Sequence, residues 1–177
     1  TPLYSSAASD VYKRQGGTPK SASWYRKAIS TIADRVTSRK LMNQGKLIGR
    51  PSVGRLNMFF YDPKYKKTLP YYDTFPLVLP IETIPGGFAG INFHYLPPAQ
   101  RFTLLQQLQR FAVRGTIDDK NRFDVSYNRV KNISLTKGAI KKYLWAHTRS
   151  SFLRIDYDEA ALAVYLPVAQ FKKGKPY

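Results

Sequence analysis

Four side chains toward the C-terminal end of the chain have the types and spacing of a surface that binds polyphosphate. Lys137, Lys141, Trp145 and Arg149 recur at intervals of four residues, which places them on one face if residues 137–150 form an α-helix, as we expect. Ammonium and guanidinium groups neutralise phosphates, and an indole stacks on bases or sugars. The pattern favours a nucleic-acid contact. The alternative is that Trp145 anchors this helix in the core, because large aromatic side chains are mostly buried.

Two further groups of cations precede this stripe. The polar side of a helix predicted over residues 21–44 carries several cations and the single acid Asp34, and a lysine cluster follows Asp62 in a predicted loop. A charged helix face is often only a solvated surface, so both interpretations stay open. The candidate DNA-contacting residues are Arg26, Lys27, Arg35, Arg39, Lys40, Lys64, Lys66, Lys67, Lys137, Lys141, Lys142, Trp145 and Arg149.

The overall composition is that of a folded basic domain. The chain has 29 Lys and Arg against 11 Asp and Glu, a net charge of +18, yet 43% of its 177 residues are hydrophobic and 14% are aromatic. A charge excess of this size repels itself in the compact state, so a polyanionic partner is expected to offset it. Nucleic acid is the leading partner. Charge alone also leaves ribosome-like RNA surfaces and anionic membranes open.

The sequence offers few groups for disulfides, metals or membranes. There are no cysteines, and His94 and His147 are the two histidines. Structural disulfides and thiolate zinc sites are therefore excluded, and a histidine-rich metal site is not expected. The most apolar stretch, residues 75–81, is short and contains two prolines. It is far from the roughly 20 apolar residues of a membrane span, so we expect no membrane partner and no cofactor.

Catalysis is not expected either. The candidate acids for a metal-dependent nuclease are Asp62, Asp73, Asp118, Asp119, Asp124, Asp156, Asp158 and Glu159. Those in residues 156–159 precede an apolar helix, where capping is the simpler interpretation. His94 lies on a predicted strand without a nucleophile pattern. The spacing from Gly49 to Gly54 is similar to a phosphate-binding loop, but Arg55 and Leu56 replace the residues that the chemistry needs.

Hydrophobic periodicity predicts an α+β fold. We expect a small antiparallel β-sheet of about three to five strands, packed with two or three amphipathic helices and preceded by an N-terminal helical arm. The expected strands are residues 56–61, 75–82, 90–96 and 151–155, and the expected helices are residues 21–44, 97–114, 137–150 and 158–166. The expected organisation is a disordered or artefactual leader (1–20), a basic amphipathic helix (21–44) and a single α+β domain (45–177).

Three runs of sequence carry a resemblance to a known family. They are residues 58–64 (MFFYDPK), 69–81 (LPYYDTFPLVLPI) and 87–98 (GFAGINFHYLPP). These runs resemble the DNA end protector proteins of T-even-type tailed phages (myoviruses) and their marine relatives. The resemblance implies a virion protein of the phage head, present in the host cytoplasm during assembly, which associates with packaged DNA ends and with head completion and has no catalytic motif.

The resulting hypothesis is a phage virion protein that binds DNA through a cationic surface without catalysis. Its partner would be the DNA backbone, at the ends of packaged DNA, with phage head, portal or neck proteins as further partners. Such binding would protect the ends from exonucleases, weaken steeply with salt and depend little on sequence. The alternatives are a structural head or tail docking protein that does not bind DNA directly, and a metal-dependent nuclease.

Overall fold

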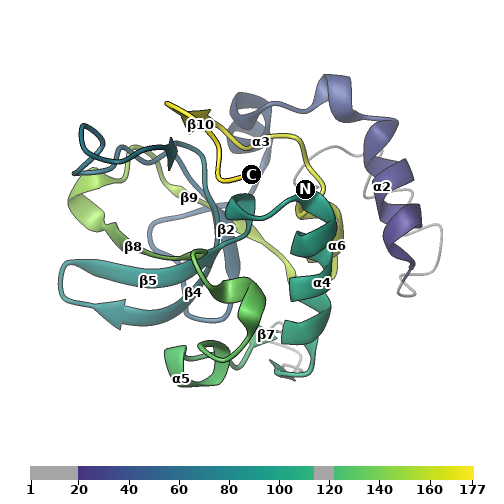
Figure 1. Cartoon of the computed structure of the whole chain (residues 1–177). Coiled ribbons are helices and arrows are strands. Elements are labelled where there is room, and N and C mark those ends of the chain that lie inside the picture. The colour runs from purple at the N-terminus through teal and green to yellow at the C-terminus, as the bar shows by residue number, and fades with distance from the viewer. Residues whose placement is uncertain (1–19, 114–121) are drawn as a thin grey trace.

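The computed structural model describes residues 20–113 and 122–177 (Figure 1). Residues 1–19 of the predicted leader lie outside the described residues, as do Asp118 and Asp119. The helices and 3-10 turns are α2 (Ala22–Ser30), η1 (Ala33–Arg35), α3 (Ser38–Gln44), η2 (Phe93–Tyr95), α4 (Pro98–Gln109), α5 (Tyr127–Val130), η3 (Ser134–Thr136), η4 (Trp145–His147), η5 (Tyr157–Glu159) and α6 (Ala160–Ala163). The strands are β1 (Leu47–Ile48), β2 (Leu56–Met58), β3 (Tyr72–Asp73), β4 (Leu77–Ile84), β5 (Gly87–Asn92), β6 (Ala112–Val113), β7 (Arg122–Phe123), β8 (Ile140–Leu144), β9 (Phe152–Ile155) and β10 (Phe171–Lys172).

The α+β prediction is confirmed, with a larger sheet than expected. Six strands pair in the order β1-β9-β2-β4-β5-β8, and every pairing is antiparallel. Two short sheets, β10-β3 and β6-β7, lie outside it. Pro80 lies within β4, and a proline inside a strand favours an edge position or a bulge. The structure has the bulge, a register shift between Pro80 and Glu82, while β4 itself is a central strand.

Both faces of the sheet are buried, so its central strands are continuously apolar. Leu77 and Leu79 of β4 face the main core, which also contains the apolar sides of α4 and α6. Val78, between them, faces a second cluster on the opposite side of the sheet. This second core consists of Phe59, Tyr61, Val78, Phe88, Tyr143 and Phe152. It is the layer on which the loop between β2 and β4 rests.

The predicted continuous helix over residues 21–44 is wrong. Two helices, α2 and α3, are separated by η1, because four of the seven connecting residues (Thr31, Ile32, Val36 and Thr37) are β-branched and Thr37 caps a new helix. Ile32 has φ −124° and ψ 0°, and the Thr37 hydroxyl accepts a hydrogen bond from Lys40 N (3.2 Å), which begins a new helix. Ile32 and Val36 are buried, so the break lies within the core.

The predicted helix over residues 137–150 is also wrong. Residues 140–144 form strand β8, paired with β5, and Trp145–His147 form η4. Gly138 has φ +77° and ends the preceding turn. Ile140 and Tyr143 suit a half-buried strand, and pairing with β5 outweighs the helical preference of the lysines. The helical stripe of Lys137, Lys141, Trp145 and Arg149 therefore does not exist as one face.

The remaining elements agree better with the sequence. The helix expected over residues 97–114 is α4, which ends at Gln109, and the strand expected at 151–155 is β9. The strand expected at 90–96 ends at Asn92, so His94 lies in η2. The apolar helix expected over 158–166 is the short pair η5 and α6. In the described part of the chain, no helix has the length and apolar character needed to cross a membrane.

Gly54 has a backbone conformation and a close contact that favour glycine over any other residue. It has φ +85°, and a Cβ would lie 2.1 Å from the Phe123 carbonyl oxygen. We predict that Gly54→Ala lowers the free energy of unfolding by at least about 1–2 kcal/mol, the usual cost of a left-handed conformation for an L-residue. Chemical denaturation measures the effect. Gly49→Ala is the control because a Cβ there would contact nothing within 4 Å, and equal stability of the two variants would contradict the prediction.

Candidate functional site

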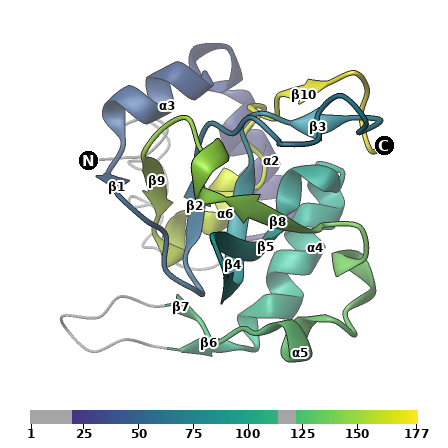
Figure 2. The ribbon, with the colours of Figure 1, turned by 90° about the vertical axis from the view of Figure 1, so that its left-hand side faces the viewer.

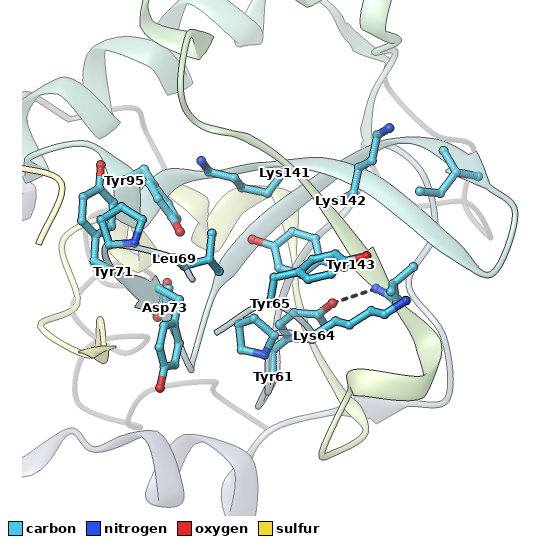
Figure 3. A pocket seen from close by; sticks show the side chains of 15 residues that line it. Tyr61, Lys64, Tyr65, Leu69, Tyr71, Asp73, Tyr95, Lys141, Lys142 and Tyr143 are labelled. Atoms are coloured by element: carbon cyan, nitrogen blue, oxygen red, sulfur yellow. Dashed lines mark hydrogen bonds between the residues drawn. The ribbon is translucent and has the colours of Figure 1, made fainter. Parts of the chain in front are cut away.

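A large hollow lies between β8 and the loop that joins β2 to β4. Its volume is about 450 Å³. Six tyrosines and three lysines are among its lining residues (Figure 3). The lining comprises Tyr61, Pro63, Lys64, Tyr65, Leu69, Pro70, Tyr71, Tyr72, Asp73, Ile84, Tyr95, Lys141, Lys142, Tyr143 and Leu144. A concave site with aromatic walls and cations is suited to an organic anion.

The loop wall of this cavity is held to η4 by backbone hydrogen bonds. Asp62 N donates to the His147 carbonyl (3.0 Å), and Arg149 N donates to the Phe60 carbonyl (2.8 Å). On the cavity side, Leu144 N of β8 donates to the Tyr61 hydroxyl (2.9 Å). The two walls are therefore fixed to each other, although Tyr61 and Leu144 are 83 residues apart in the sequence.

Lys64, Lys141 and Lys142 line the cavity, and further cations lie on or are bonded to the loop that forms one of its walls. Lys66 Nζ lies 2.8 Å from Asp62 Oδ1, and Arg149 Nη2 lies 3.5 Å from Asp62 Oδ2. The hydrogen bond from Lys66 lowers the pKa of the Asp62 carboxyl, with smaller contributions from the charges of Lys66 and Arg149. Lys173 Nζ donates to the Lys66 and Lys67 carbonyls (3.1 and 3.2 Å). We call Lys64, Lys66, Lys67, Lys141, Lys142, Arg149 and Lys173 the cationic rim.

Lys141 is the cation held deepest in this site. Its Nζ lies 4.2 Å from the centroid of the Tyr95 ring (Figure 3). Burial lowers the pKa of the Lys141 ammonium, and burial raises the pKa of the Tyr95 phenol to about 12, assisted by Asp73 and Tyr71. Within the described part of the chain no carboxylate lies within 4 Å of Lys141. Its charge is thus partly desolvated and is balanced there by an aromatic face.

Behind the cavity, the Asp73 carboxylate joins three segments of the chain. Oδ2 accepts hydrogen bonds from His94 Nδ1 (2.9 Å) and Asn92 Nδ2 (3.1 Å), and Oδ1 accepts from Phe75 N (3.0 Å) and Gln170 N (3.4 Å). Asp73 is 4% exposed and His94 is 0% exposed. Burial by itself would raise the pKa of the Asp73 carboxyl, but His94 and the hydrogen bonds lower it below its ordinary value. We call Asp73, Asn92 and His94 the carboxylate hub.

The hub positions an aromatic wall. Tyr95 follows His94 in η2, and Phe171 of β10 pairs with Asp73 of β3. The ring centroids of Tyr95 and Phe171 are 5.2 Å apart, and the Tyr71 ring lies 6.0 Å from Tyr95 and 6.3 Å from Phe171. Each ring comes from a segment that the hub ties down. The buried ionic group therefore sets the shape of the cavity.

The structure brings together only some of the residues that the sequence singled out. Lys64, Lys66, Lys67, Lys141, Lys142 and Arg149 all belong to the cationic rim. Arg26, Lys27 and Arg35 are exposed on α2 and η1, and α2 lies on the side of the molecule away from β8 (Figures 1 and 2). Arg39 and Lys40 are exposed on α3, and Lys137 is exposed before β8.

Trp145 has a different neighbourhood from the one that the helical stripe implied. Its ring lies 5.2 Å from Phe88 and 6.1 Å from Phe152, so it packs against the second core. The Arg50 guanidinium lies 4.6 Å from its ring centroid. Trp145 is half-buried between these groups. It does not line the cavity.

Sequence reasoning missed Lys173 and the convergence of the tyrosines. The signal for Lys173 was the basic C-terminal segment with Lys172, Lys173 and Lys175. The convergence of the tyrosines on one cavity was harder to predict from the sequence. Tyr71 and Tyr72 follow the lysine cluster in sequence, but Tyr61, Tyr95 and Tyr143 reach the cavity from other segments.

Four of the candidate acids, Asp62, Asp73, Asp124 and Asp156, pair with basic side chains. Asp156 occupies the N-cap position of η5, but its side chain makes no capping bond; Arg154 Nη2 lies 3.1 Å from Asp156 Oδ1. The expected side-chain cap from Asp156 or Asp158 is therefore not found: neither the N-cap of η5, Asp156, nor that of α6, Glu159, makes a side-chain capping bond. Among residues 20–113 and 122–177, no three His, Asp or Glu side chains are grouped so that they could hold a metal ion.

Comparison with known proteins gives one match. The family model described as "Phage T4 terminal DNA protecting protein" matches residues 10–177. This match confirms the resemblance seen in the sequence. No curated protein and no solved structure matches the chain.

The carboxylate hub is expected to stabilise the fold in a way that depends on pH. Asp73→Asn removes one partner of a buried pair, so we predict a loss of about 3–5 kcal/mol in the free energy of unfolding at neutral pH. The folded-state pKa of Asp73 is below its ordinary value of 3.8. The stabilisation is therefore present above pH 3.8 and is lost as the pH falls through the lower folded-state pKa.

Urea denaturation of wild type and Asp73→Asn over an acidic pH series measures this. The difference in unfolding free energy should shrink as the pH falls. Asp124→Asn is the control, because Asp124 and Arg129 form an exposed pair with 48% and 51% side-chain exposure, and exposed pairs contribute about 0–1 kcal/mol. A difference between wild type and Asp73→Asn that is small at neutral pH, or that does not change with pH, would contradict the assignment.

Proposed function

The chain belongs to the family of phage terminal DNA protecting proteins, and we propose that it binds the ends of packaged phage DNA through the cationic rim, without catalysis. The observation that carries this proposal is that Lys64, Lys141 and Lys142 line one tyrosine-rich cavity, while Lys66 and Arg149 meet at Asp62 on its loop wall. Asp62 is the acid paired with this group, and Asp73 is buried and bonded to the hub. The rim therefore retains a surplus of positive charge.

A DNA end suits such a surface. It presents phosphates at high density, and cations that neutralise them release counterions whatever the base sequence. The family name indicates protection, and occupation of the end is sufficient to exclude an exonuclease. Occupation needs neither a nucleophile nor a metal ion. Its strength depends on affinity, and thus on salt.

The two sides of the molecule suggest a division of roles. Arg26 and Lys27 of α2 are exposed on the side away from β8 (Figure 1). While the rim holds DNA, the α2 side stays accessible to phage head, portal or neck proteins. This arrangement supports a location in the virion, with DNA bound on one side and protein on the other.

Charge removal on the two sides tests the proposal. We predict that replacing Lys64, Lys66 and Lys67 together with Gln weakens binding to a linear duplex and flattens the salt dependence of log K, by about 0.9 in slope for each phosphate that the protein no longer neutralises. Replacing Arg26, Lys27 and Arg35 together with Gln is the matched control. It removes the same charge from the α2 side and should leave the slope nearly unchanged. Fluorescence anisotropy over about 50–200 mM salt measures both.

Three results would overturn the proposal. Equal losses of affinity in the two triple variants would show that net charge, and not the rim, determines binding. Failure of the wild type to bind at low salt would favour a docking protein that does not touch DNA. Cleavage of labelled linear DNA in the presence of magnesium or manganese, abolished by replacing Asp156 and Asp158, would show a nuclease.

A further inference from the structure

We propose that the tyrosine-lined cavity accepts one unpaired nucleotide from the DNA terminus, with its base against the aromatic wall and its phosphate at Lys141. This inference rests on the proposed function and goes further, because it states how an end is distinguished from the interior of a duplex. The rim would bind any stretch of backbone. The cavity would bind only a nucleotide that has left the stack.

The volume of the cavity suits a single nucleotide. The cavity volume of about 450 Å³ falls within the range of about 300–1,000 Å³ that is usual for small organic ligands. A single nucleotide belongs to that size class. A stacked base pair within a duplex is much wider and cannot enter between β8 and the loop wall. The cavity therefore selects a single nucleotide over paired DNA.

The aromatic wall of the cavity is suited to stacking on a base. Tyr71 and Tyr95 line the cavity from two segments that the carboxylate hub fixes, and Phe171 supports both rings from behind. Tyr65 is 63% exposed at the opening, with Lys64 Nζ 5.3 Å from its ring centroid. Aromatic side chains held in place in this way stack on any base, because every base has a π-face. Binding would thus be independent of sequence.

The positive charge of the lysines in the cavity is suited to a bound phosphate. Lys141 is cationic and half-buried, and within the described residues it has an aromatic partner but no carboxylate. An anion bound beside it would replace the missing hydration with an ionic interaction. Lys64 and Lys142 also line the cavity. They are placed to follow the strand from the bound nucleotide back to the duplex.

These features together explain selectivity for ends. Extracting a base from a stack costs unpairing and unstacking free energy, and that cost is least where the base is already unpaired. At a terminus one of the two stacking neighbours is absent. A site that demands an extracted nucleotide is therefore occupied most readily at an end, even though it reads no bases.

The test uses three DNA ligands of the same duplex sequence. One has a single unpaired thymidine at each end, one has blunt ends, and one is a covalently closed duplex circle, which has neither ends nor unpaired nucleotides. We expect wild type to bind them in that order of decreasing affinity. Tyr71→Leu and Lys141→Gln should each reduce the preference for the unpaired end over the closed circle, by about tenfold for the removal of one stacking or ionic interaction. Affinity for the closed circle should change little in Tyr71→Leu. It should fall in Lys141→Gln, because Lys141 also belongs to the cationic rim, so the effect of that variant is measured as the ratio of the two affinities.

Matched controls and a direct readout accompany the variants. Tyr127→Leu and Lys137→Gln remove an exposed tyrosine and an exposed lysine that do not line the cavity, and they should keep the full preference. In wild type, 5-iodouracil at the unpaired position should crosslink on irradiation to Tyr65, Tyr71 or Tyr95. The same base placed inside the duplex should not.

The outcomes separate the two proposals. Preference for open ends without a crosslink in the cavity, and unchanged in Tyr71→Leu and Lys141→Gln, would overturn the cavity assignment and leave end binding intact. Equal binding of the closed circle and the open duplex would overturn end selectivity. Absence of binding to all three ligands at low salt would overturn the proposed function itself. The crosslink is measured in wild type, so the test does not depend on the folding of a variant.

Discussion

The arrangement of this protein depends on one buried carboxylate. Asp73 binds Asn92 and His94 from the end of β5, and Gln170 N from the segment before β10. A carboxylate taken out of water is tolerated only when its oxygens are fully used, and here four hydrogen bonds use them. The same bonds hold the loop between β2 and β4, η2 and β10 at one place. Cavity, aromatic wall and cationic rim are built on that junction.

The rim shows how a highly basic chain concentrates its charge. Lysines of the loop and of β8 line one cavity, Lys173 of the C-terminal segment bonds to the loop, and Asp62 is shared between Lys66 and Arg149. Two of the cavity tyrosines, Tyr61 and Tyr143, belong to the second core, where Tyr143 stacks on Phe88 with ring centroids 5.3 Å apart. A fixed aromatic base with a cationic edge is a general solution for gripping a phosphate backbone without reading its bases.

The sequence predicts the parts of this structure that local patterns specify. Apolar runs identify β4 and β9, and Pro98 begins α4 as expected. For residues 137–150 the local pattern predicts the wrong structure. Their lysines favour a helix, but pairing with β5, which is distant in the sequence, makes residues 140–144 a strand. The carboxylate hub could not be predicted either, because it also depends on contacts between distant parts of the chain. Asp73 looks like a turn residue, and its partners Asn92, His94 and Gln170 are 19, 21 and 97 residues distant.

The central claim is that DNA is held at the cavity and its rim. Amide hydrogen exchange of the protein, free and bound to a linear duplex, tests it most directly. The account predicts slower exchange in the bound state within residues 61–73 and 140–149, with no change in Ala22–Ser30 of α2. Slower exchange confined to α2 and η1, with residues 61–73 and 140–149 unaffected, would contradict it.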